Sequence, residues 1–337
     1  MITIFLLICV TLSSLFLTAL ARRYAYAGGI IDTPGPRSSH LIPTPRGGGV
    51  SVVICTLIVL AFLPLPHKWS LWWTSALIAS VSYVDDHIGL GYKLRLACQL
   101  LLGGGYVASE LSLSSCVFPW FSDSWFCFAG GFVFLGGIVW VANLYNFMDG
   151  IDGIAATETL FVTLSLAVLY THAGAHEWAF LMLTIACSCF GFLFWNWAPA
   201  KIFMGDVGSV FLGWVLGVSM LSSAQQTNVS MWVYVILMGG FIADATFTLF
   251  SRILRGERVW LPHRTHLYQL LSIRFGDHRK VNYILMIVNV VWLLPMAIFA
   301  YLSPDYAWAC TISAYIPLSL LYYTNRRQIM KSMAREG

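Results

Sequence analysis

Long apolar stretches separated by short polar ones dominate the chain, and they predict helices that cross a membrane. One crossing of the hydrocarbon core needs about 20 mostly apolar residues. We expect eleven transmembrane helices, at approximately 2–21, 48–66, 70–84, 94–111, 126–145, 154–172, 177–195, 207–222, 231–251, 281–301 and 306–324. The third and eighth are short, so ten is the alternative count. The pattern predicts an all-α, polytopic transmembrane helix bundle that forms one domain over residues 1–337.

The composition agrees with this prediction. Hydrophobic residues make up 58% of the 337 residues and charged residues only 10%. Since charged residues make up about a quarter of an ordinary globular protein, a water-soluble globular protein is excluded. We expect membrane lipids to surround the chain, and we expect no nucleic-acid partner.

The placement of the positive charges predicts the orientation. Eleven crossings with the N-terminus in the periplasm put the odd-numbered loops and the C-terminal tail in the cytoplasm. All but one of the 19 Lys and Arg residues then lie on the cytoplasmic side, and Lys68 is the exception. This is the bias of the positive-inside rule. Arg22 and Arg23 follow the first segment and no cation precedes it, which argues against a cleaved signal peptide.

Acidic residues gather on the same predicted side, in loops 22–47, 85–93, 143–153, 196–206 and 252–280, where we expect the active site. An Asp near a helix end is commonly a cap or a solvated charge. A cap or a solvated charge could explain any one of these aspartates, but it explains less well why six of them gather on four loops of the same side. The group consists of Asp32, Asp85, Asp86, Asp149, Asp152 and Asp206.

Two motifs have spacings that suggest chemistry. Asp85 and Asp86 are adjacent in SYVDDHIGLGYKLR, and adjacent carboxylates repel unless a cation or a proton separates them, which favours a metal site or a base. In NLYNFMDGIDG a carboxamide or carboxylate recurs every three residues, a spacing that can gather oxygen ligands on one side of a helical turn. These residues are Asn143, Asn146, Asp149 and Asp152.

A third motif, FMGDVGS at 203–209, places Asp206 between two glycines before a predicted helix. If Val207 opens that helix, Asp206 can cap it, and the free backbone amides favour an anion. Oxygen ligands without a His or Cys cluster at metal spacing favour Mg²⁺, with Mn²⁺ as the alternative.

Loop 252–280 is basic, with seven Lys and Arg residues together with His263, His266 and His278. It suits phosphate groups of a substrate, or alternatively the anionic headgroups of a membrane surface. The compact HRTH segment at 263–266 is harder to explain as a headgroup contact. Asp244 lies inside a predicted helix, where a charge is costly; it marks either a functional site or a buried structural ion pair.

These motifs, in this order and on one predicted side, resemble those of the polyprenyl-phosphate N-acetylhexosamine-1-phosphate transferases. The similarity covers nearly the whole chain and includes DTPGPRSSHLIPTPRGGG at 32–49. It implies that, at the inner leaflet of a bacterial inner membrane, undecaprenyl phosphate attacks a UDP-N-acetylhexosamine and releases UMP. It also implies Mg²⁺ as the cofactor, and a homodimer is compatible with it.

The resemblance implies roles for individual residues. Asp206 and Asn146 would bind the metal, and Asp85 or Asp86 would act on the lipid phosphate, either by positioning it for a single displacement or as a nucleophile in a double one. The sequence leaves both schemes open. The remaining candidates would bind substrate: Asp149, Asp152, Asn143, Lys93, Arg95, His263, Arg264, His266, Arg46 and His40.

The histidine motif differs from one branch of this family. HRTHLYQ lacks the paired histidines of the HxHH pattern, which argues against the peptidoglycan branch with its muramoyl-pentapeptide donor. It is similar to the branch that initiates O-antigen or other surface polysaccharides from UDP-GlcNAc, UDP-FucNAc or UDP-QuiNAc. A polytopic transporter is the alternative outside this class, but it should place its charged site near the bilayer midplane.

Overall fold

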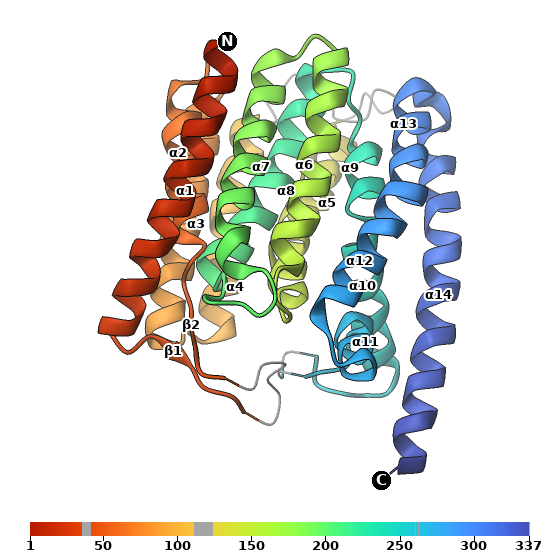
Figure 1. Ribbon diagram of the computed structural model, residues 1–337. Helices are drawn as coiled ribbons and strands as arrows, with labels where there is room; N and C mark the ends of the chain where they lie inside the picture. Colours follow the sequence, from red (N-terminus) through yellow and green to blue (C-terminus); the bar gives the residue numbers. More distant parts are fainter. Residues whose placement is uncertain (36–41, 111–123, 260, 262, 337) are drawn as a thin grey trace.

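The computed structural model describes residues 1–35, 42–110, 124–259, 261 and 263–336. It is a bundle of helices that run along one common direction (Figure 1). The helices are α1 (Ile2–Ala27), α2 (Val50–Phe62), α3 (Lys68–Ile88), α4 (Tyr92–Glu110), α5 (Ser124–Met148), α6 (Ile154–His172), α7 (His176–Asn196), α8 (Asp206–Gln226), α9 (Met231–Leu237), α10 (Gly239–Leu254), α11 (Leu267–Phe275), α12 (His278–Val288), α13 (Leu294–Leu302) and α14 (Ala307–Glu336).

Helices cover most of every predicted apolar segment within the described residues, which confirms the all-α bundle. Among the described residues, six helical stretches are long and apolar enough to cross a membrane: Ile2–Ala27, Ala129–Met148, Ile154–His172, His176–Asn196, Asp206–Gln226 and His278–Leu302. The pair α9 and α10, bent by 75°, makes a seventh if it is one span. The chain is therefore a polytopic membrane protein. The count of eleven crossings and the orientation stay predictions.

The core lies around α8, where 94% of the residues in its most apolar stretch are buried. A helix that is apolar on all sides belongs inside a bundle, and Phe211 and Trp214 of α8 are fully buried. In α1 the corresponding share is only 17%, so this helix exposes most of its surface. The start of α8 is thereby placed between the ends of α3 and α5 at one end of the bundle.

Two of the predicted spans are interrupted. The segment predicted at 231–251 breaks at Met238 into α9 and α10. The segment predicted at 281–301 contains a π-helical turn, Asn289–Leu293, between α12 and α13. Such turns are rare and are frequent at functional sites. A 3₁₀ turn, Pro304–Tyr306, then leads into α14.

Loops at one end of the bundle are joined by backbone hydrogen bonds. The first loop forms a short antiparallel pair of β1 (Ile31–Asp32) and β2 (Thr44–Pro45), in which Asp32 lies opposite Thr44. Phe203 N then donates to the Pro45 carbonyl (2.8 Å), and Gly48 N donates to the Phe203 carbonyl (2.9 Å). In Figure 1 this pair, α11 and the C-terminus lie at the lower end, and the N-terminus lies at the upper end.

Candidate active site

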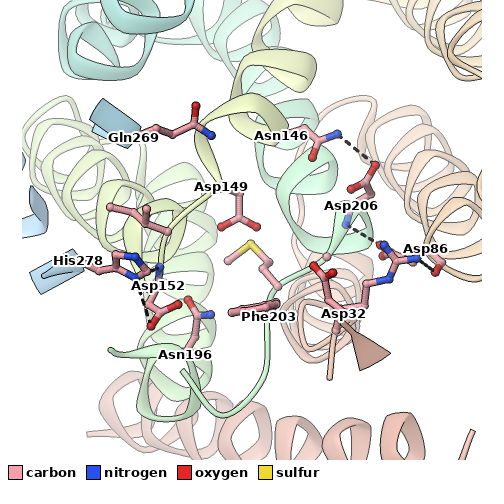
Figure 2. A pocket seen from close by; sticks show the side chains of 15 residues that line it. Asp32, Asp86, Asn146, Asp149, Asp152, Asn196, Phe203, Asp206, Gln269 and His278 are labelled. Carbon is pink, nitrogen blue, oxygen red and sulfur yellow. Dashed lines mark hydrogen bonds and ion pairs between the residues drawn. The ribbon is translucent and has the colours of Figure 1, made fainter. Parts of the chain in front are cut away.

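A polar cavity of about 260 Å³ opens at the end of the bundle where the acidic motifs meet. Five aspartates from four separate segments line it (Figure 2). The lining residues are Asp32, Arg46, Asp86, Asn146, Asp149, Gly150, Ile151, Asp152, Asn196, Phe203, Met204, Gly205, Asp206, Gln269 and His278. Six of the fourteen residues proposed from the sequence therefore lie on one cavity.

Asp86, in the last turn of α3, caps the N-terminus of α8. Its Oδ1 accepts a hydrogen bond from Asp206 N (3.1 Å) and its Oδ2 accepts one from Val207 N (3.0 Å). The prediction that Asp206 caps a helix beginning at Val207 is wrong, because α8 begins at Asp206 and a carboxylate from another helix binds its free amides. Gly205 has φ +77°, and a Cβ there would lie 2.7 Å from Asp86 Oδ2, so this approach requires glycine.

The neighbouring Asp85 points to a different partner. Arg95 Nη1 donates to Asp85 Oδ2 (2.7 Å) and to Asp206 Oδ2 (2.9 Å), so one guanidinium joins the DD motif to the FMGD motif. Asp85 Oδ1 also accepts from Leu90 N (2.6 Å). The predicted repulsion between the two carboxylates is thus relieved by different means. Arg95 faces Asp85, whereas helix amides face Asp86.

Burial raises the pKa of Asp86, while the amide donors of Val207 and Asp206 and the charge of Arg46 act in the opposite direction. Arg46 also donates to the backbone carbonyl of Asp86. The carboxyl of Asp86 is therefore enclosed and fixed, with both oxygens already accepting hydrogen bonds.

The two proposed metal ligands lie side by side. Asn146 Nδ2 donates to Asp206 Oδ2 (3.1 Å), and Ser209 Oγ donates to Asn146 Oδ1 (3.3 Å). No group of three His, Cys, Asp or Glu residues within the described parts of the chain is arranged to hold a metal ion. This donor set suits Mg²⁺ nonetheless, since that ion is usually bound by only one or two carboxylates and completes its shell with water and phosphate oxygens.

Asp149 follows directly on α5 and points into the cavity between these ligands and Asp152 (Figure 2). Burial raises its pKa well above the ordinary value, and the negative charges of Asp206, Asp86 and Asp152 raise it further. Carboxylates crowded in this way favour a proton or a cation between them. This crowding is the structural observation that fits a divalent ion.

Asp152 ties its loop to two other elements. Its Oδ2 accepts from Ala200 N (3.0 Å), its carbonyl accepts from Asn282 Nδ2 (2.8 Å), and its own N–H donates to His278 Nδ1 (3.3 Å). The same His278 nitrogen lies 3.4 Å from Asp152 Oδ2. Asp152 therefore fixes one wall of the cavity.

Several proposed residues do not line this cavity. Asn143 turns toward α4, where its Nδ2 donates to Gln99 Oε1 (2.6 Å), and Lys93 is exposed at the start of the same helix. Asp85 and Arg95 reach the cavity only through Asp206. His263, Arg264 and His266 lie in the segment before α11, and the two histidine rings stack with centroids 4.8 Å apart. His40 lies outside the described residues.

Four polar lining residues, Asp32, Asn196, Gln269 and His278, were not among the individual site residues predicted from the sequence. Asp32 and His278 were visible only as members of the acidic group and of the basic loop. Asn196 is a lone amide at the end of an apolar segment, and its Oδ1 accepts from Gly153 N (3.0 Å). Gln269 stands three residues after His266, a spacing that could have indicated a helix start there.

Comparison with known proteins places the chain in a family. The model of the family described as Glycosyl transferase family 4 matches residues 68–224. A phospho-N-acetylmuramoyl-pentapeptide-transferase of Chlamydia trachomatis serovar L2 is 32% identical, over 68% of this chain and 76% of that protein. The chain belongs to glycosyl transferase family 4.

Two other relatives in this family carry different names. A probable undecaprenyl-phosphate N-acetylglucosaminyl 1-phosphate transferase of Bacillus subtilis is 27% identical, over 83% of this chain and 80% of that protein. A decaprenyl-phosphate N-acetylglucosaminephosphotransferase of Mycolicibacterium smegmatis is 26% identical, over 82% of this chain and 77% of that protein. The relatives thus include proteins named for both kinds of sugar donor.

Proposed function

We propose that the protein transfers N-acetylhexosamine 1-phosphate from a UDP-sugar to undecaprenyl phosphate. The observation that carries this proposal is the cavity lined by five aspartates at one end of a membrane bundle of this family. An oxygen of the lipid phosphate attacks the β-phosphorus of the donor, the anhydride bond to UMP breaks, and UMP leaves. One phosphoanhydride replaces another, so the reaction needs no ATP.

Mg²⁺, held by Asp206 and Asn146, would neutralise charge on the donor pyrophosphate. Arg95 then keeps the Asp206 carboxylate oriented through its 2.9 Å contact. Arg46 supplies a positive charge on the cavity wall. Asp152 and Asn196 hold the opposite wall in place for the donor.

The hydrogen bonds of Asp86 favour a single displacement. Both of its oxygens accept backbone N–H donors, and a carboxylate bound in this way is a weak nucleophile. In our proposal Asp86 positions the α8 N-terminus and the lipid phosphate, and Asp85 holds Arg95. An acyl-phosphate intermediate on either residue is not required.

For the donor, we propose UDP-GlcNAc, UDP-FucNAc or UDP-QuiNAc, with the product serving O-antigen or other surface-polysaccharide synthesis. The support is the HRTHLYQ segment, which lacks the paired histidines. The chlamydial relative keeps a muramoyl-pentapeptide donor as the alternative. A transporter is disfavoured because the acids line a cavity at one end of the bundle.

The test measures UMP release by the purified full-length protein with undecaprenyl phosphate, Mg²⁺ and a panel of UDP-sugars that includes UDP-MurNAc-pentapeptide. We expect Mg²⁺-dependent UMP release with one N-acetylhexosamine donor. Asp206→Asn should melt like the wild type and lose about 10²-fold or more of the activity, the usual scale for a group that stabilises transition-state charge. Asp305→Asn, an exposed acid between α13 and α14, is the matched control and should remain active. No UMP with any donor, or full activity of Asp206→Asn, would contradict the proposal.

A further inference from the structure

Asp244 on α10 binds the start of a different helix. Its side chain is buried, with 7% of the residue exposed. Oδ1 accepts from Leu267 N (2.9 Å) and Oδ2 accepts from Tyr268 N (2.9 Å), which are the first two amides of α11. A carboxylate in this position satisfies free N–H groups and stabilises the positive end of the helix dipole. The start of α11 is therefore fixed to α10.

The same carboxylate faces the HRTH segment. His266, the residue before α11, is buried, and its Nδ1 lies 3.4 Å from Asp244 Oδ1. The His266 ring stacks on the ring of His263. Asp244 thus contacts both the first turn of α11 and the last residue of the histidine motif.

From α11 the contacts continue to the cavity. Tyr268 Oη donates to the Phe147 carbonyl (2.8 Å), two residues before Asp149. A Cβ on Gly150 would lie only 2.2 Å from Tyr268 Oη, so this hydroxyl occupies the space of a side chain at that position. One residue further along α11, Gln269 lines the cavity. A shift of α11 would therefore move the segment that carries Asp149.

Behind Asp244 a chain of hydroxyl groups leads to a cation on α14. Thr248 Oγ1 donates to Asp244 Oδ1 (3.1 Å) and lies 2.9 Å from Tyr322 Oη. Arg326 Nη1 donates to Tyr322 Oη (2.5 Å). The acid is buried with two amides, one hydroxyl and one imidazole around it, so no direct cation pair is needed to hold it.

We propose that Asp244 is a positioning residue for the transferase reaction. It fixes the start of α11 so that the HRTH segment faces the substrate phosphates and Tyr268 holds the 147–150 backbone against the cavity. It acts through Tyr268 and does not contact substrate. The catalytic part of this inference rests on the proposed function.

The kinetic test is a double-mutant cycle of Asp244→Asn and Tyr268→Phe. Asp244→Asn keeps the shape of the side chain but replaces one carboxylate oxygen with an NH₂ group, which would face a backbone N–H of α11 and could not accept its hydrogen bond. The second removes only the hydroxyl that holds Phe147. We expect each variant to lower kcat by about 10–10²-fold, because a displacement of about 1 Å at a reacting centre costs on that order, with the KM for undecaprenyl phosphate unchanged. The double variant should lose no more than the worse single one. The proposal would be overturned if the losses in kcat of the two single variants multiplied in the double variant and simply tracked the decrease in melting temperature.

A second test needs no substrate. In the wild type the Arg264–Thr265 bond lies directly before α11, whose start is fixed by Asp244, so trypsin should cut this bond slowly. In folded Asp244→Asn we expect cleavage after Arg264 to rise by about tenfold or more, as expected when a segment opens locally. Cleavage after Lys280 on α12 should not change. Unchanged cleavage after Arg264 would overturn the proposal.

Tyr322→Phe is the matched control, because it removes a hydroxyl behind Asp244 and leaves both amide contacts in place. It should be cut after Arg264 as slowly as wild type. Increased cleavage in Asp244→Asn without UMP release by the wild type would reject the proposed function but support the role of Asp244 in fixing the start of α11. UMP release by the wild type with unchanged cleavage in Asp244→Asn would support the proposed function and reject the role of Asp244.

Discussion

At the residue scale, the candidate site brings several carboxylates so close together that their negative charges repel one another unless a proton or a cation lies between them. The side chain of Asp149 is buried near the negative charges of Asp206, Asp86 and Asp152. Burial and these charges raise its pKa above the ordinary value of 3.8. Burial and these charges thus shift the protonation equilibrium of Asp149 toward the neutral form in the folded, metal-free protein. A divalent cation would reverse this preference, since it stabilises the ionised form.

Asp149→Asn should therefore stabilise the metal-free protein at alkaline pH. Because the folded-state pKa of Asp149 is raised, its contribution to stability is fully present below the unfolded pKa and is lost as the pH rises through the folded pKa. Asn does not ionise, so in EDTA at pH 8 the variant should melt about 2–4 °C above wild type, which corresponds to roughly 1 kcal/mol. The difference should shrink toward pH 5, and Mg²⁺ should raise the melting temperature of wild type more than that of the variant. A variant that melts below wild type at both pH values would contradict this account.

At the scale of elements, two helices begin against carboxylates supplied by other helices. Asp86 of α3 binds the start of α8, and Asp244 of α10 binds the start of α11. The sequence could predict that the acidic motifs converge, because alternate loops of a membrane bundle share one side. It could not predict either cap, since a cap read from sequence is sought just before its own helix. Asn143 shows the same limit, because its spacing matched a ligand set whereas packing turned it toward Gln99.

A buried pair joins α6 to the π-helical turn, and this contact makes a prediction about stability. Asn289 Nδ2 donates to Glu158 Oε2 (2.5 Å), and both residues are almost fully buried. Asn289→Leu should lower the free energy of unfolding by about 1–3 kcal/mol, because it leaves the carboxyl of Glu158 without its donor. The double variant Glu158→Met and Asn289→Leu should recover most of this loss, since removing both partners is nearly neutral. Thermal melting in detergent measures both, and a double variant less stable than Asn289→Leu would contradict the pairing.

At the scale of the whole molecule, the ends of the bundle differ in charge and chemistry. The N- and C-termini lie at opposite ends (Figure 1), as an odd number of crossings requires. Arg46 and Lys201 lie at or beside the cavity end, whereas Lys68 begins α3 at the end away from Asp86. The positive-inside rule therefore predicts that the cavity end faces the cytoplasm.

Labelling of single cysteines tests this orientation. In a variant without the natural cysteines, Lys201→Cys marks the loop between α7 and α8 at the cavity end, and His176→Cys marks the start of α7 at the other end; both positions are exposed. A membrane-impermeant maleimide added to intact spheroplasts should label Cys at 176 and should reach Cys at 201 only after permeabilisation. A permeant maleimide should label both and serves as the control for reactivity. The reverse pattern would place the cavity outside the cell. It would contradict both the positive-inside rule and the use of a cytoplasmic nucleotide donor.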